Sequence, residues 1–246
     1  MNNKRIHQQH RRRFLGITGV AAATVVLNGL PLAARAASRR MKIGIVGSGK
    51  VGTAIGSSWV RAGHTVMFSS RSIDHDEALA ARLGDNALAG TPRQAAEFGE
   101  VVMISVPYHA LPDVRKDLGD LIEGKVVIDT CNPFVWRDGE LATWAREKGA
   151  GLASLELLPG ARIVRAFNAI GYVNMGNAYQ QPGRIGMPIA SDDADAIAIA
   201  LPLIRDVGYE PVMIGGMEMG KYLMPGTPLA GEHTPKEVRE IAATLK

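Results

Sequence analysis

The chain has 246 residues, a formal net charge of +4 and an apolar content of 46%, which suits one domain with a full core, or one domain with a small appendage. Its single cysteine excludes an internal disulfide. Residues 1–36 contain six basic residues and no acidic residue, so subtracting 6 from +4 leaves −2 for the remaining 210 residues. The rest of the chain therefore has no basic excess that would indicate nucleic-acid binding.

The first 36 residues have the three parts of an export signal. The basic stretch RRRFLG (11–16) precedes an apolar run at 17–32, and LAARAAS supplies the small-x-small cleavage site at Ala34 and Ala36. The apolar run is too short for a membrane span. The paired arginines, Arg11 and Arg12, resemble the twin-arginine export signal.

Three regions follow from this pattern. We expect a signal peptide of the twin-arginine type at 1–36, a linker at 37–40 and the folded domain at 41–246, with no integral membrane span after signal removal. The expected location is periplasmic or otherwise exported. An uncleaved anchor remains open as an alternative, and so does a cytoplasmic protein whose start is Met41.

Strand-like and helix-like segments alternate along the remaining chain. Seven short segments rich in β-branched residues predict strands at 41–46, 64–69, 101–106, 125–130, 161–167, 184–190 and 210–215. Helices are expected at 51–62, 92–98, 141–148 and 193–207, and a last helix after the capping pattern Thr234, Pro235, Glu237. The alternation predicts a Rossmann-like α/β fold, a doubly wound and mostly parallel sheet in a single compact domain.

The first strand runs directly into GSGKVG, the glycine spacing of a dinucleotide-binding turn. In such a turn the first glycine makes the tight bend, the second lets the main chain approach a pyrophosphate, and the third allows the helix to pack closely on the strand. The helix N-terminus then offers free N–H groups to the phosphates. The residues predicted to bind the dinucleotide here are Gly47, Ser48, Gly49, Lys50, Val51 and Gly52.

The end of the second strand favours NADP(H) over NAD(H). An acidic residue usually stands there to bind the ribose 2′-hydroxyl, whereas an arginine accommodates a 2′-phosphate. This chain has Arg71 among Ser69, Ser70 and Ser72, and no acid from 66 to 73. We expect Ser70 and Arg71 to bind the 2′-phosphate, although an ordinary solvated arginine in a turn would have the same sequence.

The sequence resembles the NADP oxidoreductases that depend on coenzyme F420. The similarity is carried by IGIVGSGKVGTAIGSSWVRAGHTVMFSSR, VVMISVPYHALPDV, VVIDTCNPF and LLPGARIVRAFNAI, and it extends with lower specificity through RDVGYEPVMIG. Membrane-anchored ferric reductases with an N-terminal domain of this type are related, so the fold alone leaves the electron acceptor open. The export signal departs from the family, and MGKYLMPGTPLAGEHTPKE matches no segment of it.

The resemblance implies NADP(H) as cofactor and F420 or a flavin as second cofactor or substrate, stacked in a cleft at the carboxyl ends of the strands. It implies that the nicotinamide is lined by Val106, Pro107, Cys131, Asn132, Pro133 and Asn168. Direct hydride transfer between stacked rings requires no protein nucleophile, so no catalytic residue is assigned. The expected partner is a small redox acceptor, with a homodimer left open.

We interpret several other polar and sulfur-containing residues as structural and not as functional. His109 reads as a hydrogen-bonded surface residue, with a general acid as the alternative, and Cys131 as a small buried residue. Met213, Met217, Met219 and Met224 read as core and cleft lining, because no His or Cys accompanies them. The acidic stretch at 74–77 reads as a solvated helix start. No metal site is expected.

Two classes of function are compatible with these residues. The first is an oxidoreductase that transfers hydride between NADPH and a deazaflavin, flavin or other small acceptor. Dehydrogenases of the β-hydroxyacid or pyrroline-carboxylate type are weaker candidates, because they need a further helical domain and only about thirty residues follow Gly215. The second class is a non-catalytic NADP-binding sensor, which would bind no second ring.

Overall fold

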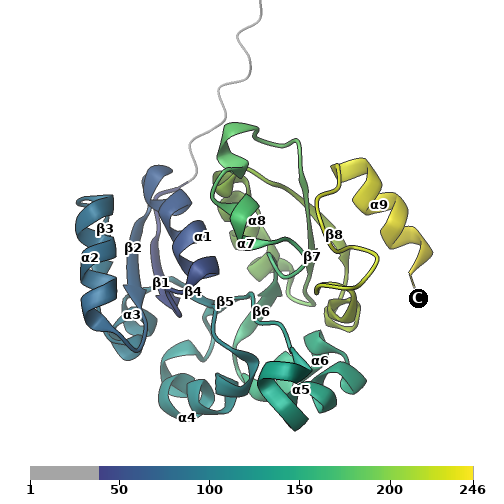
Figure 1. Cartoon of the computed structure of the whole chain (residues 1–246), viewed down its shortest axis with the longest axis horizontal. Helices are drawn as coiled ribbons and strands as arrows, with labels where there is room; N and C mark the ends of the chain where they lie inside the picture. Colours follow the sequence, from purple (N-terminus) through teal and green to yellow (C-terminus); the bar gives the residue numbers. More distant parts are fainter. Residues whose placement is uncertain (1–38, 246) are drawn as a thin grey trace, which may run out of the picture. The chain divides into compact units, whose positions relative to one another are not determined.

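The computed structural model describes residues 39–245. Eight strands form one sheet in the order β3-β2-β1-β4-β5-β6-β7-β8 (Figure 1). The strands are β1 (Lys42–Val46), β2 (Thr65–Ser69), β3 (Ala87–Ala89), β4 (Val101–Ile104), β5 (Val126–Asp129), β6 (Arg162–Arg165), β7 (Gly186–Ala190) and β8 (Glu210–Gly215). Neighbouring strands are parallel except for β6 and β7, which meet antiparallel where Arg165 pairs with Ala190. The predicted doubly wound, mostly parallel sheet is confirmed.

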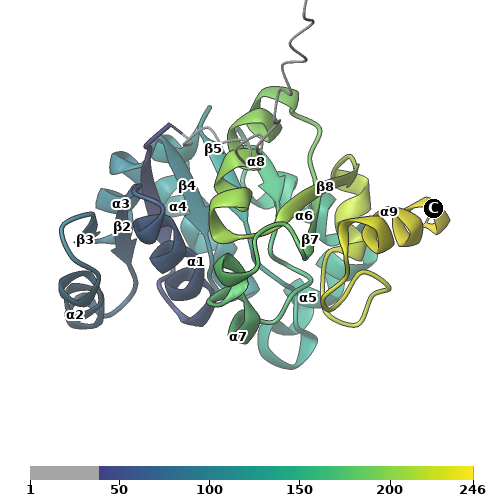
Figure 2. The same cartoon turned by 90° about the horizontal axis from the view of Figure 1, so that it is seen from above.

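Helices connect the strands and cover both faces of the sheet. The α-helices are α1 (Lys50–Arg61), α2 (Ile73–Leu83), α3 (Pro92–Phe98), α4 (Leu111–Ile122), α5 (Val135–Lys148), α6 (Ala150–Leu157), α7 (Tyr172–Met175), α8 (Ala194–Val207) and α9 (Pro235–Thr244). The short 3₁₀ helices are η1 (Tyr108–Ala110), η2 (Ala178–Gln180) and η3 (Met217–Tyr222). Helix α1 packs with α7 and α8, whereas α3 packs with α4, and α4 with α6. From above, α2 lies near one end of the sheet and α9 at the other (Figure 2).

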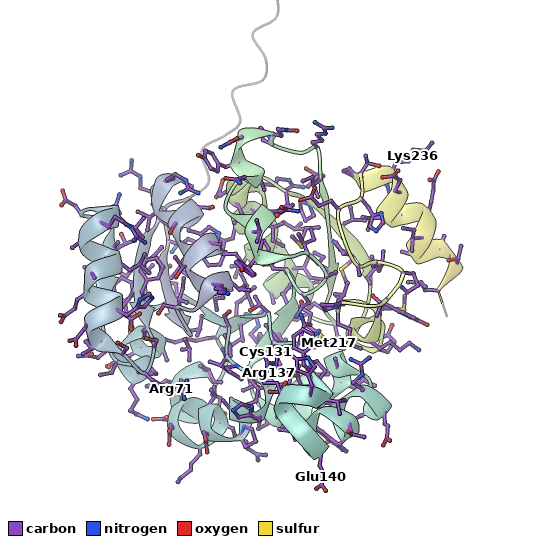
Figure 3. All side chains as sticks on the ribbon, viewed as in Figure 1. Arg71, Cys131, Arg137, Glu140, Met217 and Lys236 are labelled. Carbon is purple, nitrogen blue, oxygen red and sulfur yellow. The ribbon has the colours of Figure 1, made fainter. Side chains whose placement is uncertain are left out.

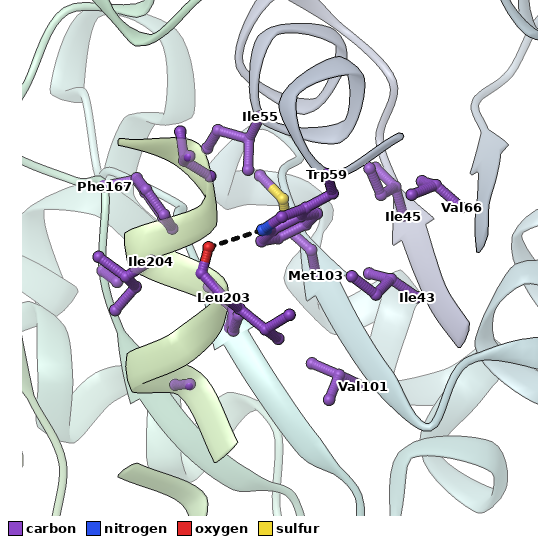
Figure 4. Packing of buried hydrophobic residues seen from close by; sticks show 14 of the residues in the cluster. Ile43, Ile45, Ile55, Trp59, Val66, Val101, Met103, Phe167, Leu203 and Ile204 are labelled. Atoms are coloured by element: carbon purple, nitrogen blue, oxygen red, sulfur yellow. Dashed lines mark hydrogen bonds between the residues drawn. The ribbon is translucent and has the colours of Figure 1, made fainter. Parts of the chain in front are cut away.

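Alternate residues of the central strands enter two separate cores. Ile43 and Ile45 of β1 belong to the core that contains residues of α1 and α8, whereas Val46 belongs to the core on the side of α4 and α6. The first core is built around Trp59, which is fully buried and donates its Nε1–H to the main-chain oxygen of Leu203 at 2.8 Å (Figure 4). Strands with apolar side chains on both faces need two covering layers, as the sequence pattern predicts.

The last helix closes a third, smaller cluster at the β8 end of the sheet. Val238 of α9 packs there with Val212 and Leu229. The predicted N-terminal pattern of this helix is confirmed: Thr234 Oγ1 accepts the N–H of Glu237, and the Glu237 carboxylate accepts the N–H of Thr234. Within residues 39–245, no helix combines the length and the apolar character that a membrane crossing needs.

The observed elements differ from the predicted ones in two ways. Several elements were not predicted, among them β3, α4, α6, α7 and most of α2. The strand expected at 161–167 ends at Arg165, because Phe167 has a left-handed backbone (φ 67°) that cannot continue a strand. This early end places Asn168 in the loop beyond the sheet.

Candidate functional site

The glycine turn between β1 and α1 has the geometry that its spacing predicts. Gly47 has φ +104°, and a Cβ there would lie 2.2 Å from the main-chain oxygen of Ser105. A Cβ on Gly52 would lie 2.1 Å from the oxygen of Gly47, so the helix approaches the turn too closely for any side chain. The bend at Gly47 and the close packing at Gly52 are therefore confirmed. A Cβ on Gly49 would meet no atom within 4 Å, which leaves space beside the main chain.

The N-terminus of α1 is open to an anion. Gly49 is its N-cap and supplies no side-chain cap, and the first turn of the helix carries no acidic residue. Lys50 stands exposed in that turn, with Nζ 5.0 Å from the ring centroid of Tyr172. Free N–H groups and a cation favour a phosphate at this point.

Ser48 has a structural role in the turn. Its N–H, like that of Gly47, donates to the main-chain oxygen of Ser69 at 2.9 Å. Its buried hydroxyl donates to the carboxylate of Asp76. The N–H and the O–H of Ser48 therefore both donate to groups of the protein. These hydrogen bonds connect the glycine turn to β2 and α2.

The loop after β2 presents one free cation. Arg71 is exposed and makes no hydrogen bond or ion pair with any described residue. Ser70 donates to Asp76 Oδ2 at 2.8 Å, and Ser72 caps α2 by accepting the N–H of His75. Ser69, the other serine of this stretch, is fully buried and donates its hydroxyl to the Ile45 oxygen at 2.6 Å, so it offers no hydroxyl to a ligand. Arg71 therefore remains the main candidate for binding a 2′-phosphate.

The acidic start of α2 is not uniformly solvated. Asp76 is fully buried and receives hydrogen bonds from Ser48 and Ser70. The interpretation of this stretch as a solvated helix start is thus wrong for Asp76. A carboxylate that holds both the glycine turn and the loop after β2 explains why an acid stands at this position.

Two amide side chains meet where β5 and β6 end. Asn132 donates from Nδ2 to the main-chain oxygen of Asn168 at 2.8 Å, and Asn168 donates from Nδ2 to the oxygen of Cys131 at 3.3 Å. The Oδ1 atoms of both residues are buried and accept no hydrogen bond from a described residue. Buried amide oxygens are rarely left without a donor. Two such oxygens fit the carboxamide NH₂ of a nicotinamide, which is the group that the family resemblance implies here.

A buried ion pair stabilises the turn after β5. The side chains of Asp129 and Arg165 are fully buried and contact each other, and Ser154 donates to the same carboxylate at 2.7 Å. Asp129 Oδ1 accepts the N–H of Cys131 at 2.8 Å, and Arg165 donates to the oxygen of Cys131 at 3.2 Å. Both main-chain polar groups of Cys131 are therefore held by charged partners.

The thiol of Cys131 is not reactive. The residue is 1% exposed, and burial together with the nearby carboxylate of Asp129 raises its pKa well above the ordinary value. A thiol that stays protonated is a poor nucleophile. The interpretation of Cys131 as a small buried residue is confirmed.

Strained backbone precedes Asn168. Phe167 is the one non-glycine residue with positive φ among the described residues. Its ring is held edge-on by Trp59 and Tyr209, with ring centroids 6.5 and 6.1 Å away. Such a conformation persists only where packing fixes it, and it is common at binding sites. The packing of Phe167 thus sets the direction in which the chain presents Asn168.

A second polar cluster joins the loop after β4 to the start of α5. His109 Nδ1 lies 2.8 Å from Asp138 Oδ1, and the N–H of Phe134 donates to Asp138 Oδ2 at 3.0 Å. Arg137 contacts both oxygens of this carboxylate at 2.9 and 2.7 Å, and also donates to the oxygen of Asn132 at 2.9 Å. The Asp138 side chain is fully buried, whereas that of His109 is 53% exposed.

Burial and hydrogen bonding act in opposite directions on Asp138. Burial disfavours the charged carboxylate, but the hydrogen bonds from Arg137, Phe134 and His109 outweigh burial and lower its pKa. Asp138 is therefore a stable anion behind the His109 ring. Sequence reasoning assigned no role to Asp138, Asp129 or Arg165. A signal was present for Arg165, because a cation within the apolar strand RIVRAF requires a buried partner.

The other predicted residues lie at the same edge of the sheet. Val106 and Pro107 follow β4 and are half-buried, and the side chain of Val106 faces the place where a Cβ of Gly47 would stand. Pro133 is buried in the turn after β5. Figure 3 shows Cys131 and Arg137 near the middle of the molecule and Arg71 apart from them, toward α2. The described residues contain no group of three or more His, Cys, Asp or Glu that could hold a metal ion.

Comparisons with known proteins agree with this arrangement. The family described as NADP oxidoreductase, coenzyme F420-dependent, matches residues 42–133, which include the glycine turn, Arg71 and Asn132. Over these residues the chain is similar to that family. The family resemblance and the enzyme class, an NADP-dependent oxidoreductase, are therefore confirmed.

Individual relatives extend the similarity beyond the matched region. The F420-dependent NADP reductase of Methanothermobacter thermautotrophicus is 26% identical over 203 residues, which cover 77% of this chain and 87% of that protein. The rat protein Metalloreductase STEAP3 is 26% identical over 176 residues, covering 72% of this chain but 34% of that protein. A hypothetical protein from Sinorhizobium meliloti has the same fold, with a TM-score of 0.62 and 24% identity, over 78% of this chain and 94% of that one.

Proposed function

We propose that this protein transfers hydride between NADPH and a planar ring acceptor of the deazaflavin or flavin type. The observation that carries the nicotinamide part is the pair of buried amide oxygens on Asn132 and Asn168, which lack donors at the carboxyl edge of the sheet. Ligands of open α/β sheets bind at that edge, near the point where the strand order reverses. Here the order reverses between β1 and β4.

The binding groups follow one another along this edge. Arg71 would hold the 2′-phosphate, the N-terminus of α1 with Lys50 the pyrophosphate, and Asn132 with Asn168 the carboxamide. The bound dinucleotide supplies a dihydronicotinamide, which is a hydride donor. The protein's task is to orient this ring and to exclude water from it.

The nature of the acceptor is supported by one exposed aromatic side chain, that of Trp136. Trp136 is 82% exposed and lies 5.9 Å from the ring of Phe134, in the stretch that follows Asn132. Large exposed aromatic side chains beside a binding site suit a partner with a flat face. The name of the methanogen relative points in the same direction, to F420. A reductase of another small acceptor stays an alternative.

A ligand titration separates the enzyme from a sensor that binds NADP alone. Purified protein saturated with NADP⁺ is titrated with oxidised F420 and, separately, with FMN, while Trp136 fluorescence is followed. The proposal expects saturable quenching by one of these rings, absent in Trp136→Leu and retained in Trp144→Leu. Firm NADPH binding with no second ring bound would support the sensor.

The location of the protein is a separate proposal. The expected signal peptide lies outside the described residues. We propose that it directs export through the twin-arginine route, which moves proteins with their cofactors already bound. Replacing Arg11 and Arg12 by Lys should then leave full-length protein in the cytoplasm. Unchanged export of that variant would show that the paired arginines do not act as such a signal.

A further inference from the structure

We infer that His109, held by Asp138, supplies the proton that accompanies hydride transfer to the ring acceptor. The inference rests on the proposed function and adds a proton donor to it. The starting observation is that the imidazole is bound at one nitrogen only. Nδ1 lies 2.8 Å from Asp138 Oδ1, whereas Nε2 contacts no polar atom of the described residues.

The location of the ring follows from its neighbours. His109 stands three residues after Val106, in the loop that leaves β4 at the reversal of strand order. Arg137, which clamps Asp138, also donates to the oxygen of Asn132. The same cluster therefore fixes the imidazole and the turn that carries one of the two unpaired amide oxygens.

The Asp138 carboxylate sets the orientation of the imidazole. It is fully buried and accepts from Arg137, from the N–H groups of Phe134 and His109, and from the imidazole itself. Because it remains an anion, it favours a proton on Nδ1 and leaves Nε2 to exchange the second proton. The exposed fraction of the His109 side chain, 53%, gives Nε2 access to solvent.

The proposed step balances as a two-electron reduction. The C4–H bond of the dihydronicotinamide breaks, and its electron pair forms the new bond to hydrogen on the acceptor ring. A ring nitrogen of the acceptor takes the proton from Nε2 of the imidazolium, which becomes neutral with its hydrogen on Nδ1. Solvent then returns a proton to Nε2. In the reverse direction, neutral His109 accepts the proton from the reduced ring.

The charged surroundings of His109 determine how the rate depends on pH. On α5 they are Asp138 and Arg137. The other helix packed against η1 is α4, whose first turn carries Asp113. Because the proposed step consumes the proton on Nε2, ring reduction should slow as pH rises.

One readout needs no turnover. Nitrogen-15 NMR of the imidazoles, with His109→Gln to assign the signal, reports which nitrogen carries the hydrogen in the neutral form. We expect the Nδ1–H form in the unmutated protein and its loss in Asp138→Asn. A neutral His109 with its hydrogen on Nε2 in the unmutated protein would overturn the inference.

The second readout is the pH profile of ring reduction. In His109→Gln we expect a rate roughly a hundredfold to ten-thousandfold lower, which is the usual size of general acid catalysis, with a flat profile and unchanged NADPH affinity. His233, which lies near the oxygen of Ala230, supplies the control His233→Gln with an unchanged profile. If ring reduction by His109→Gln matches that of the unmutated protein in rate and pH profile, His109 is not the proton donor, and the proposed function is unaffected. If the unmutated protein reduces no ring, the proton donor and the proposed function are both rejected.

Discussion

The side chain of Asn132 donates to the main-chain oxygen of Asn168 at 2.8 Å, and this contact ties the turn after β5 to the loop after β6. Each residue keeps a buried amide oxygen without a donor. Two loops that are 36 residues apart in the chain are thereby held with their acceptors in the same small region. This arrangement motivates the first prediction.

Asn168→Leu should weaken NADPH binding about fivefold, since a hydrogen bond of this kind contributes roughly 1 kcal/mol. The loss should be specific to the nicotinamide end of the ligand. Calorimetric titration with NADPH and with 2′,5′-ADP, which lacks the nicotinamide, checks this. Equal losses for both ligands would place Asn168 away from the carboxamide.

Arg71→Ala should have the complementary effect. Loss of a charge-assisted contact should weaken NADPH and 2′,5′-ADP roughly tenfold to hundredfold, while NADH affinity hardly changes. Arg82→Ala, at the far end of α2, is the matched control for loss of one exposed cation. The unmutated protein must itself bind NADPH more tightly than NADH. Equal affinity for NADPH and NADH would reject Arg71 as a phosphate site.

Two glycine substitutions separate folding from binding. Gly52→Ala places a Cβ 2.1 Å from the Gly47 oxygen, so it should cost about 1–3 kcal/mol of unfolding free energy and also impair binding. Gly49→Ala meets no atom, so thermal stability should hardly change while NADPH affinity falls. Gly119→Ala, in α4 and equally open, controls for the added methyl group. A Gly49→Ala variant with normal affinity would show that the pyrophosphate does not lie there.

Stability should depend on pH through Asp138. The pKa of Asp138 is lower in the folded protein than the ordinary value of 3.8. The charged carboxylate therefore stabilises the fold at pH values above 3.8, and this stabilisation is lost as the pH falls through the pKa of the folded protein. Asp138→Asn should therefore cost about 2 kcal/mol at neutral pH and progressively less toward pH ~3. Urea denaturation at several pH values measures this. The control Glu156→Gln removes an exposed ion pair with Lys148 and should change little.

Much of the fold follows from residue type and short-range pattern. Alternating apolar residues and turn glycines place the central strands, and Gly47 with Gly52 identifies the dinucleotide turn, because each of these signals acts within a few residues of chain. Short or featureless elements are missed. β3 has three residues, and α6 reads AGLASLEL without a clear polar face.

The site is predicted less completely because its polar contacts cross long stretches of chain. His109 and Asp138 are 29 residues apart, and Asp129 and Arg165 are 36 apart. Arg165 leaves a local signal, as a cation within an apolar strand, but the sequence around either pair does not identify the partner. Asp76 looks like any acid in the first turn of a helix, where solvation is the usual outcome, and its burial depends on Ser48, which lies before the previous helix.

The most direct test of the central claim is an acceptor screen with purified protein and NADPH under anaerobic conditions. Absorbance follows NADPH and the acceptor in the same cuvette, and the acceptors are F420, FMN, simple ketones and imines. Hydroxy acids are tested separately as hydride donors to NADP⁺. The account predicts stoichiometric loss of NADPH and of an oxidised ring, F420 or FMN, with no turnover of the ketones, imines or hydroxy acids. Turnover of an imine or a hydroxy acid, with neither ring reduced, would contradict it.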